Sequence, residues 1–160
     1  MDMPLEPQTL SDLEYCYEYF HDGSVRHEWY WKSQLHSVED HAAVIIEPEQ
    51  EQMWYTHGMR HRPAHLGPAW IKPQTKTEVY YKFGYIHRAD GPAMITATDK
   101  KWYKDGRLHR ADGPAVIRDR APGRPLEWHW YGIACKDFDH WSSVAAISDE
   151  EKVMLKLTYG

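Results

Sequence analysis

The chain has 160 residues, which is enough for one ordinary domain and too few for two comfortable ones. Its formal net charge of −5 argues against general binding of duplex nucleic acid, which requires a clustered basic surface. Eight Trp and eleven Tyr suit short strands with half-buried positions. We therefore expect a mainly all-β protein with a single domain over residues 1–160.

The N-terminal residues MDMPLEPQ have neither a basic segment nor an apolar run, so no secretory signal is visible. The longest strongly apolar run, AAVII at residues 42–46, is far too short to span a membrane. The two cysteines, Cys16 and Cys135, are too few for a disulfide framework, and neither has flanking sequence typical of a nucleophile. We expect a cytoplasmic protein without a membrane span.

The first predicted element follows SDLE at residues 11–14, which fits a helix capping box. The next residues, YCYEYF, alternate as a strand does, and we favour a strand from about Tyr15. Asp22 and Gly23 then predict a turn into a second strand.

The stretch HRADGPA occurs twice, at residues 87–93 and 109–115. In the surrounding sequence Gly84 and Gly106 are equivalent, and they are 22 residues apart. An exact repetition of this kind is the mark of a structural repeat, which should be recognised before any chemistry is assigned.

Five copies of the repeat are recognisable, and they differ in quality. Residues 80–95 and 102–117 are clean copies, residues 54–71 carry two inserted residues, and residues 29–45 and 128–138 are degenerate. Atypical copies at the ends are expected in a repeat array. We assign residues 15–138 to the repeats.

Each copy is predicted to form a β-hairpin. Aromatic residues precede a glycine turn, and Asp-Gly-Pro supplies a second turn before the next strand begins at Pro-Ala-Val-Ile. A single hairpin is only marginally stable, so the copies must stack. The segments 48–52, 72–78 and 120–125 are predicted loops.

The C-terminal residues 139–160 are predicted to be a helical cap. Ser148 and Glu151 form a capping box, and Val153, Met154 and Leu157 share the spacing of one apolar helix face. We expect this helix to pack over the last hairpin, with another short helix within residues 139–147.

The clean copies WYKDGRLHRADGPAVI and YYKFGYIHRADGPAMI resemble the MORN repeat, a hairpin unit of similar length with an aromatic-aromatic-x-x-Gly core. Their HRxDGPA motif is similar to that of repeat proteins frequent in bacteriophage and large-virus genomes. The resemblance covers roughly residues 29–132, although ordinary MORN units lack the His-Arg-Asp. It implies an elongated, twisted, groove-bearing antiparallel sheet used for binding, as a membrane-proximal scaffold, a protein-interaction module or an antitoxin-like partner.

The repeated His-Arg-Asp has two interpretations. It forms either a row of cationic donors for an anionic ligand or a structural link in which Arg pairs with an acid and His caps a turn carbonyl. We favour the structural interpretation, because residues identical in every copy serve the repeat itself. The ligand interpretation keeps six candidate residues, namely His87, Arg88, Lys82, Lys104, His109 and Arg110.

His57, His61 and His65 have the four-residue spacing that would place three imidazoles on one face of a helix, as a zinc site requires. The repeat places a turn at Gly58, so a helix is not expected there, and we predict no metal and no cofactor. The sequence contains no recognised catalytic motif, so we predict a protein that is not an enzyme.

Partner-binding positions are expected where the copies differ. One candidate is Trp31, and the others form the aromatic cluster Trp128, Trp130 and Tyr131, for which packing beneath the helix that begins at Ser148 is the favoured alternative.

We therefore expect a non-enzymatic binding protein that binds and inhibits, or scaffolds, a host protein through one face of the sheet. The acidic balance suits a basic partner surface. The alternatives are a sponge for an anionic nucleotide signal of host defence and an antitoxin-like immunity protein. If the protein is viral, it would act in the host cytoplasm. The sequence does not determine whether the protein forms an oligomer.

Overall fold

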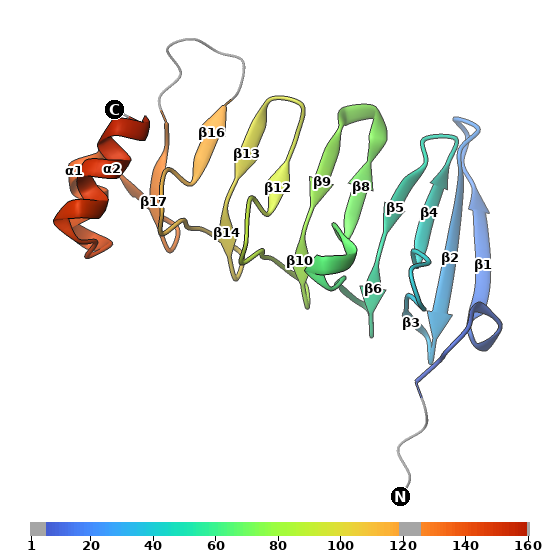
Figure 1. Ribbon diagram of the computed structural model, residues 1–160. Helices are drawn as coiled ribbons and strands as arrows, with labels where there is room; N and C mark the ends of the chain where they lie inside the picture. Colours follow the sequence, from blue (N-terminus) through green and yellow to red (C-terminus); the bar gives the residue numbers. More distant parts are fainter. Residues whose placement is uncertain (1–5, 119–125, 160) are drawn as a thin grey trace, which may run out of the picture. The chain divides into compact units, whose positions relative to one another are not determined.

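The computed structural model describes residues 6–118 and 126–159 (Figure 1). These residues contain 18 strands and two α-helices, both helices lying in the C-terminal segment, so the predicted mainly-β class is confirmed. The chain divides into two compact units, unit 1 (Met1–Tyr85) and unit 2 (Ile86–Gly160). The single domain stays a prediction, and the predicted loop at residues 120–125 lies almost wholly outside the described residues. Among those residues no helix is long and apolar enough to cross a membrane.

Unit 1 is built on one antiparallel sheet in the order β1-β2-β4-β5-β8-β9, with β3 paired to β2 and with β6 and β7 paired to each other (Figure 1). The strands are β1 (Glu14–Tyr19), β2 (Val25–Trp31), β3 (Gln34–Leu35), β4 (Val44–Glu47), β5 (Glu51–Met53), β6 (Tyr55–Thr56), β7 (Met59–Arg60), β8 (Trp70–Lys72), β9 (Thr77–Val79) and β10 (Tyr81–Lys82). Three 3₁₀ turns accompany them, η1 (Leu10–Asp12), η2 (Ala64–Leu66) and η3 (Pro73–Thr75), and β11 (Tyr85–Ile86) lies at the boundary with unit 2.

The prediction for the first strand is confirmed. The capping box is formed by Thr9 and Asp12 of the short turn η1 and not by Ser11 and Glu14, and the Thr9 backbone N–H donates to Asp12 at 2.8 Å. The alternating run that follows becomes β1. All six residues of β1 pair in regular register with β2, from Glu14 opposite Tyr30 to Tyr19 opposite Val25.

Unit 2 carries the antiparallel strands β12-β13-β16 and the separate hairpins β14–β15 and β17–β18. The strands are β12 (Met94–Ile95), β13 (Asp99–Lys101), β14 (Tyr103–Lys104), β15 (Arg107–Leu108), β16 (Val116–Arg118), β17 (Trp128–Trp130) and β18 (Ile133–Cys135). They are followed by the helices α1 (Phe138–Val144) and α2 (Asp149–Tyr159).

The glycine turns of the repeats follow one backbone pattern. The residue before the glycine and the glycine itself both have positive φ, as at Asp105 (49°) and Gly106 (78°). Two successive positive φ angles define the type I′ turn, whose twist matches that of a two-residue hairpin. Where Ser33 replaces the glycine, it adopts the same region with φ 60°.

The alanine of the GPA motif forms the centre of each repeat. Ala69 in unit 1 and Ala93 and Ala115 in unit 2 have no exposed surface. The backbone N–H of Trp54 donates to the carbonyl of Ala69 at 2.9 Å, and Trp102 bonds Ala115 in the same way at 2.9 Å. A larger side chain at this position would not fit, because the site is close-packed.

The prediction for the terminal helix is half right. Ser148 and Glu151 form the expected reciprocal cap, with hydrogen bonds of 2.8 and 3.2 Å. The predicted apolar face is wrong, because Val153, Met154 and Leu157 are 58, 63 and 78% exposed. The shorter helix α1 covers the last hairpin instead, since its Trp141 is fully buried against that hairpin.

Candidate functional site

The repeated histidine links one hairpin to the turn of the next. In unit 1, Nδ1 of His36 accepts the backbone N–H of His57 at 3.3 Å, and Nδ1 of His61 accepts that of Phe83 at 3.4 Å. The Phe83 ring stacks on His61 with a centroid distance of 4.1 Å. The imidazole therefore supplies an acceptor to a turn amide that the hairpin's own strands leave without one.

The same bond recurs in unit 2. Nδ1 of His87 accepts the backbone N–H of Asp105 at 3.2 Å, and Nδ1 of His109 accepts that of Tyr131 at 3.3 Å. Tyr131 also stacks on His109, with centroids 4.1 Å apart. We expected the histidine to bond a turn carbonyl, and this detail is wrong: the ring nitrogen accepts a hydrogen bond from an amide.

At His36, His61 and His109 this arrangement requires a neutral ring with the proton on Nε2, because an accepting Nδ1 carries none. At His87 the same nitrogen also lies 2.9 Å from a carboxylate oxygen of Asp105. Burial lowers the pKa of His61, and Lys82 adds to this effect. Burial also lowers the pKa of His109, with a further contribution from Lys104. The environment therefore favours the charge state that the hydrogen bond needs.

The arginine of the motif is also used within its own repeat. Nε of Arg88 donates to Asp90 at 3.0 Å, and Nε of Arg110 donates to Asp112 at 2.9 Å. A Cβ added to Gly113 would lie 3.0 Å from the Arg110 guanidinium carbon, so this glycine lets the side chain lie against the backbone. The predicted pairing of each arginine with an acid is confirmed at both positions.

Aromatic rings also contact the guanidinium groups of Arg110 and of Arg62, the equivalent arginine of the edited copy. Arg110 lies 4.0 Å from the centroid of Trp102, and in unit 1 Arg62 lies 3.9 Å from that of Trp54. Arg62 also pairs with Asp40. The motif arginine therefore stabilises the repeats through cation–π and charge-assisted contacts, within one copy at Arg110 and between two copies at Arg62.

A hollow of about 370 Å³ in unit 2 gathers most of the predicted ligand residues. Its lining includes His87, Arg88, Lys104, His109 and Arg110, together with Trp102 and Asp112. Lys82 is an exposed residue of β10 in unit 1 and is not part of this lining. The Lys104 ammonium donates to the Tyr131 hydroxyl at 3.0 Å, which raises the pKa of the lysine.

The four predicted partner-binding aromatics differ in exposure. Trp128 is 7% exposed and contacts Trp141 of α1, with ring centroids 4.9 Å apart. Trp128 is thus packed beneath a helix, as the favoured alternative predicted. The covering helix is mainly α1 and not the helix that begins at Ser148, which is α2. Trp31 and Trp130 are partly buried, and Tyr131 is 41% exposed.

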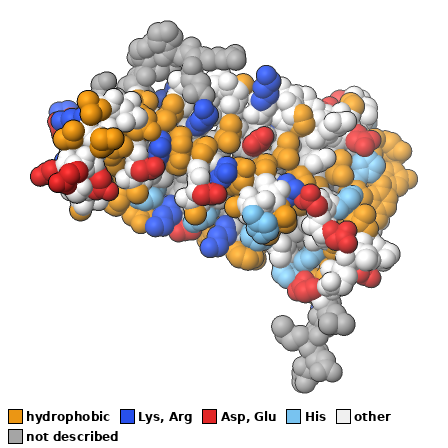
Figure 2. Space-filling view, viewed as in Figure 1, with side chains coloured by type: hydrophobic (Ala, Val, Ile, Leu, Met, Phe, Trp, Pro, Cys, Tyr) orange, Lys and Arg blue, Asp and Glu red, His pale blue; other side chains and the backbone are white. Residues whose placement is uncertain are grey.

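Sequence reasoning missed a larger exposed aromatic surface on β1. Tyr15, Tyr17 and Tyr19, which we call the aromatic edge, are 51, 57 and 73% exposed. Adjacent rings are 6.1 and 5.4 Å apart, and β1 has one neighbour in the sheet order. Figure 2 shows hydrophobic side chains gathered at this end of unit 1. The alternation YCYEYF carries this signal, because it places a tyrosine at every second position of the predicted strand and so on one face of it.

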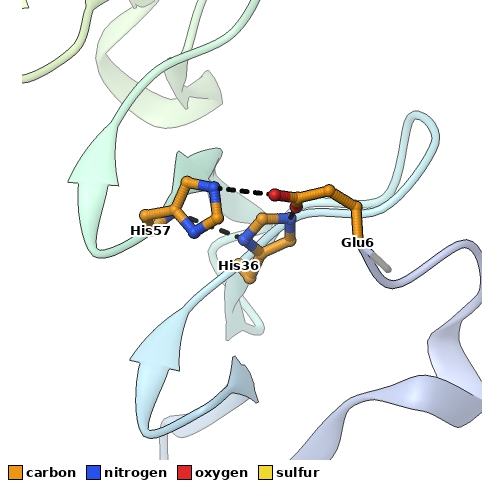
Figure 3. Close-up of side chains that lie close together, drawn as sticks. All are labelled: Glu6, His36 and His57. Atoms are coloured by element: carbon orange, nitrogen blue, oxygen red, sulfur yellow. Dashed lines mark hydrogen bonds and ion pairs between the residues drawn. The ribbon is translucent and has the colours of Figure 1, made fainter. Parts of the chain in front are cut away.

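The described residues also include one cluster of metal-ligating type, formed by Glu6, His36 and His57 (Figure 3). Its donor atoms lie within 4.8 Å of one another. The structure thus separates His57 from His61 and His65, with which the sequence spacing had grouped it.

Comparison with known proteins found no matching family model, no matching curated protein and no matching solved structure.

Proposed function

We propose that this protein is a non-enzymatic binding module that holds a protein partner along the aromatic edge. The observation that carries the proposal is the exposure of Tyr15, Tyr17 and Tyr19 on a regular edge strand. Soluble proteins ordinarily protect such edges with charges, prolines, bulges or a covering segment. A regular, aromatic-rich edge suits the addition of a partner strand.

The pleat of β1 gives its two faces different chemistry. The tyrosines alternate with Glu14, Cys16 and Glu18, so one face is aromatic and the other carries carboxylates. Tyr15 extends the aromatic face to Trp29 on β2, with ring centroids 5.1 Å apart. A partner strand with apolar residues facing the tyrosines and basic residues facing the glutamates would complement both faces.

We propose a host protein as this partner, an assignment that rests on the resemblance to viral repeat proteins. The net charge of −5 supports a partner with a basic surface. Inhibition of that host protein, or scaffolding of it, would follow from occupation of its surface.

The test is affinity purification with the tagged full chain from a host lysate, followed by quantitative mass spectrometry. The double variant Tyr17→Lys with Tyr19→Lys places charges on the edge and should lose a partner that the wild type retains in stoichiometric amount. Tyr85→Lys is the matched control, because Tyr85 is 62% exposed and lies outside β1. Equal recovery with the double variant and the wild type would reject the aromatic edge as the binding surface.

The hollow of unit 2 supports a second candidate function, the sequestration of an anionic nucleotide. Arg88, Lys104 and Arg110 bring cationic groups to one hollow beside an indole ring. The pairing of both arginines with aspartates reduces the net positive charge available to a ligand. For this reason the protein-binding proposal comes first.

Thermal-shift measurements with cyclic and ADP-ribose-type nucleotides test this second candidate. One nucleotide should raise the melting temperature of the wild type and of Lys82→Gln, and it should have a smaller effect on Lys104→Gln. An unchanged melting temperature with every nucleotide would reject it.

A further inference from the structure

Three segments of unit 1 bring Glu6, His36 and His57 together (Figure 3). Glu6 precedes η1, His36 directly follows β3, and His57 lies in the turn between β6 and β7. In Figure 3 the carboxylate of Glu6 faces both imidazoles. The cluster contains none of the residues of the aromatic edge.

The two distances between the carboxylate and the imidazoles are close to those of a metal's ligand shell, and all the donor atoms lie within 4.8 Å of one another. Nε2 of His57 lies 3.2 Å from one Glu6 oxygen, and Nε2 of His36 lies 3.7 Å from the other. Tetrahedral zinc with bonds of about 2.0–2.1 Å places neighbouring ligand atoms about 3.3 Å apart. Small side-chain movements would therefore bring the donor atoms into coordination distance.

We propose that Glu6, His36 and His57 bind one divalent transition-metal ion of the zinc class. Two imidazoles and one carboxylate favour Zn²⁺, Co²⁺, Ni²⁺ or Cu²⁺ over Mg²⁺ and Ca²⁺, which prefer all-oxygen ligands. Three protein ligands leave a coordination position for water or for a donor atom of another molecule.

Exposure within the cluster suits an ion that enters from solvent. The side chain of His36 is 7% exposed, whereas those of His57 and Glu6 are 39 and 56% exposed. The buried histidine is held in place by the repeat, and the two exposed ligands can close on the ion from outside. Bound metal would tie the segment before η1 to the turn between β6 and β7.

Metal binding would have a local structural consequence. Nδ1 of His36 accepts the backbone N–H of His57, so the neutral ring carries its proton on Nε2. Coordination through Nε2 moves that proton to Nδ1, and the hydrogen bond to the His57 amide is lost. The His57 amide is therefore a reporter that weak metal binding at other surface histidines would not affect.

The experiment is titration of the full chain with Zn²⁺ in chelator-free buffer, followed by calorimetry and by ¹H–¹⁵N NMR. We expect one equivalent to bind and the His57 amide resonance to move. Glu6→Gln and His57→Gln should each weaken binding by more than the roughly tenfold that loss of an outer-shell partner costs, because each variant loses a direct ligand of the metal. His65→Gln is the matched control, because His65 is exposed, lies outside the cluster and should leave binding unchanged.

Both altered residues are partly or fully exposed, so the variants should fold, and the NMR spectrum of each checks this. Absence of stoichiometric Zn²⁺ binding by the wild type would overturn the proposal. Binding that is equally strong in Glu6→Gln and His57→Gln, or that leaves the His57 amide resonance in place, would overturn it too.

Discussion

The first hairpin of unit 1, β1–β2, and the last hairpin of unit 2, β17–β18, use their aromatic residues in opposite ways. In the last hairpin, α1 covers Trp128, which packs against the fully buried Trp141. In the first hairpin, the three tyrosines of the aromatic edge remain more than half exposed. Similar residue types are therefore buried in one place and exposed in the other, depending on whether a helix covers them.

The largest effect is expected where aromatic residues form the core. Trp141→Ala should lower the free energy of unfolding by about 3–5 kcal/mol, because a fully buried indole leaves a large cavity. Urea unfolding measures the change. Tyr19→Ala, at the most exposed tyrosine of the aromatic edge, should stay within about 0.5 kcal/mol of the wild type. Equal losses of unfolding free energy in Trp141→Ala and Tyr19→Ala would contradict the difference in burial between the two hairpins.

A smaller loss is expected when the link between hairpins is removed. His109→Ala takes away the acceptor of the Tyr131 backbone N–H and should cost about 1–3 kcal/mol in unfolding free energy. His65→Ala, at an exposed histidine outside the repeated motif, provides the control in the same urea experiment. A loss below about 0.5 kcal/mol for His109→Ala would show that this bond contributes little.

Backbone conformation should affect both hairpins alike. Gly132 in the last hairpin and Gly23 in the first have φ of 89° and 87°, and an added Cβ would meet only ordinary contacts or open space. Replacing either by alanine should cost about 1–2 kcal/mol, from the left-handed backbone alone. Thermal unfolding of the two variants checks this, and a much larger loss at Gly132 would indicate that packing also contributes.

The smallest effect is expected from pH. Burial lowers the pKa of His61 and His109, so below about pH 6.5 the unfolded chain binds protons that the folded chain does not. Stability contributed by these neutral rings is complete above that pH and falls as the pH is lowered through it. Urea midpoints between pH 7.5 and 5.5 should decrease less in the double variant His61→Gln with His109→Gln. An identical pH dependence of the urea midpoint in the wild type and the double variant would show that His61 and His109 do not cause it.

Particular residues show how far the sequence could be interpreted. Gly84 and Gly106 identified the turns correctly, because a two-residue hairpin needs positive φ and glycine adopts it freely. The spacing of Val153, Met154 and Leu157 predicted the wrong helix face, because periodicity cannot show which neighbour is available to cover it. His57 was grouped with His61 and His65 by spacing, whereas its neighbours in space come from segments 21 and 51 residues earlier.

The sequence by itself determined the repeat length, the turns and the helix that begins at Ser148, because each depends on backbone preferences of residues close in the chain. Tertiary structure decided which groups the histidine and tyrosine side chains contact. The repeated histidine bonds an amide 18–22 residues away, the tyrosines of β1 stay uncovered, and Glu6 meets His36 and His57. These outcomes depend on which strands and helices pack side by side, and local residue preferences do not encode that.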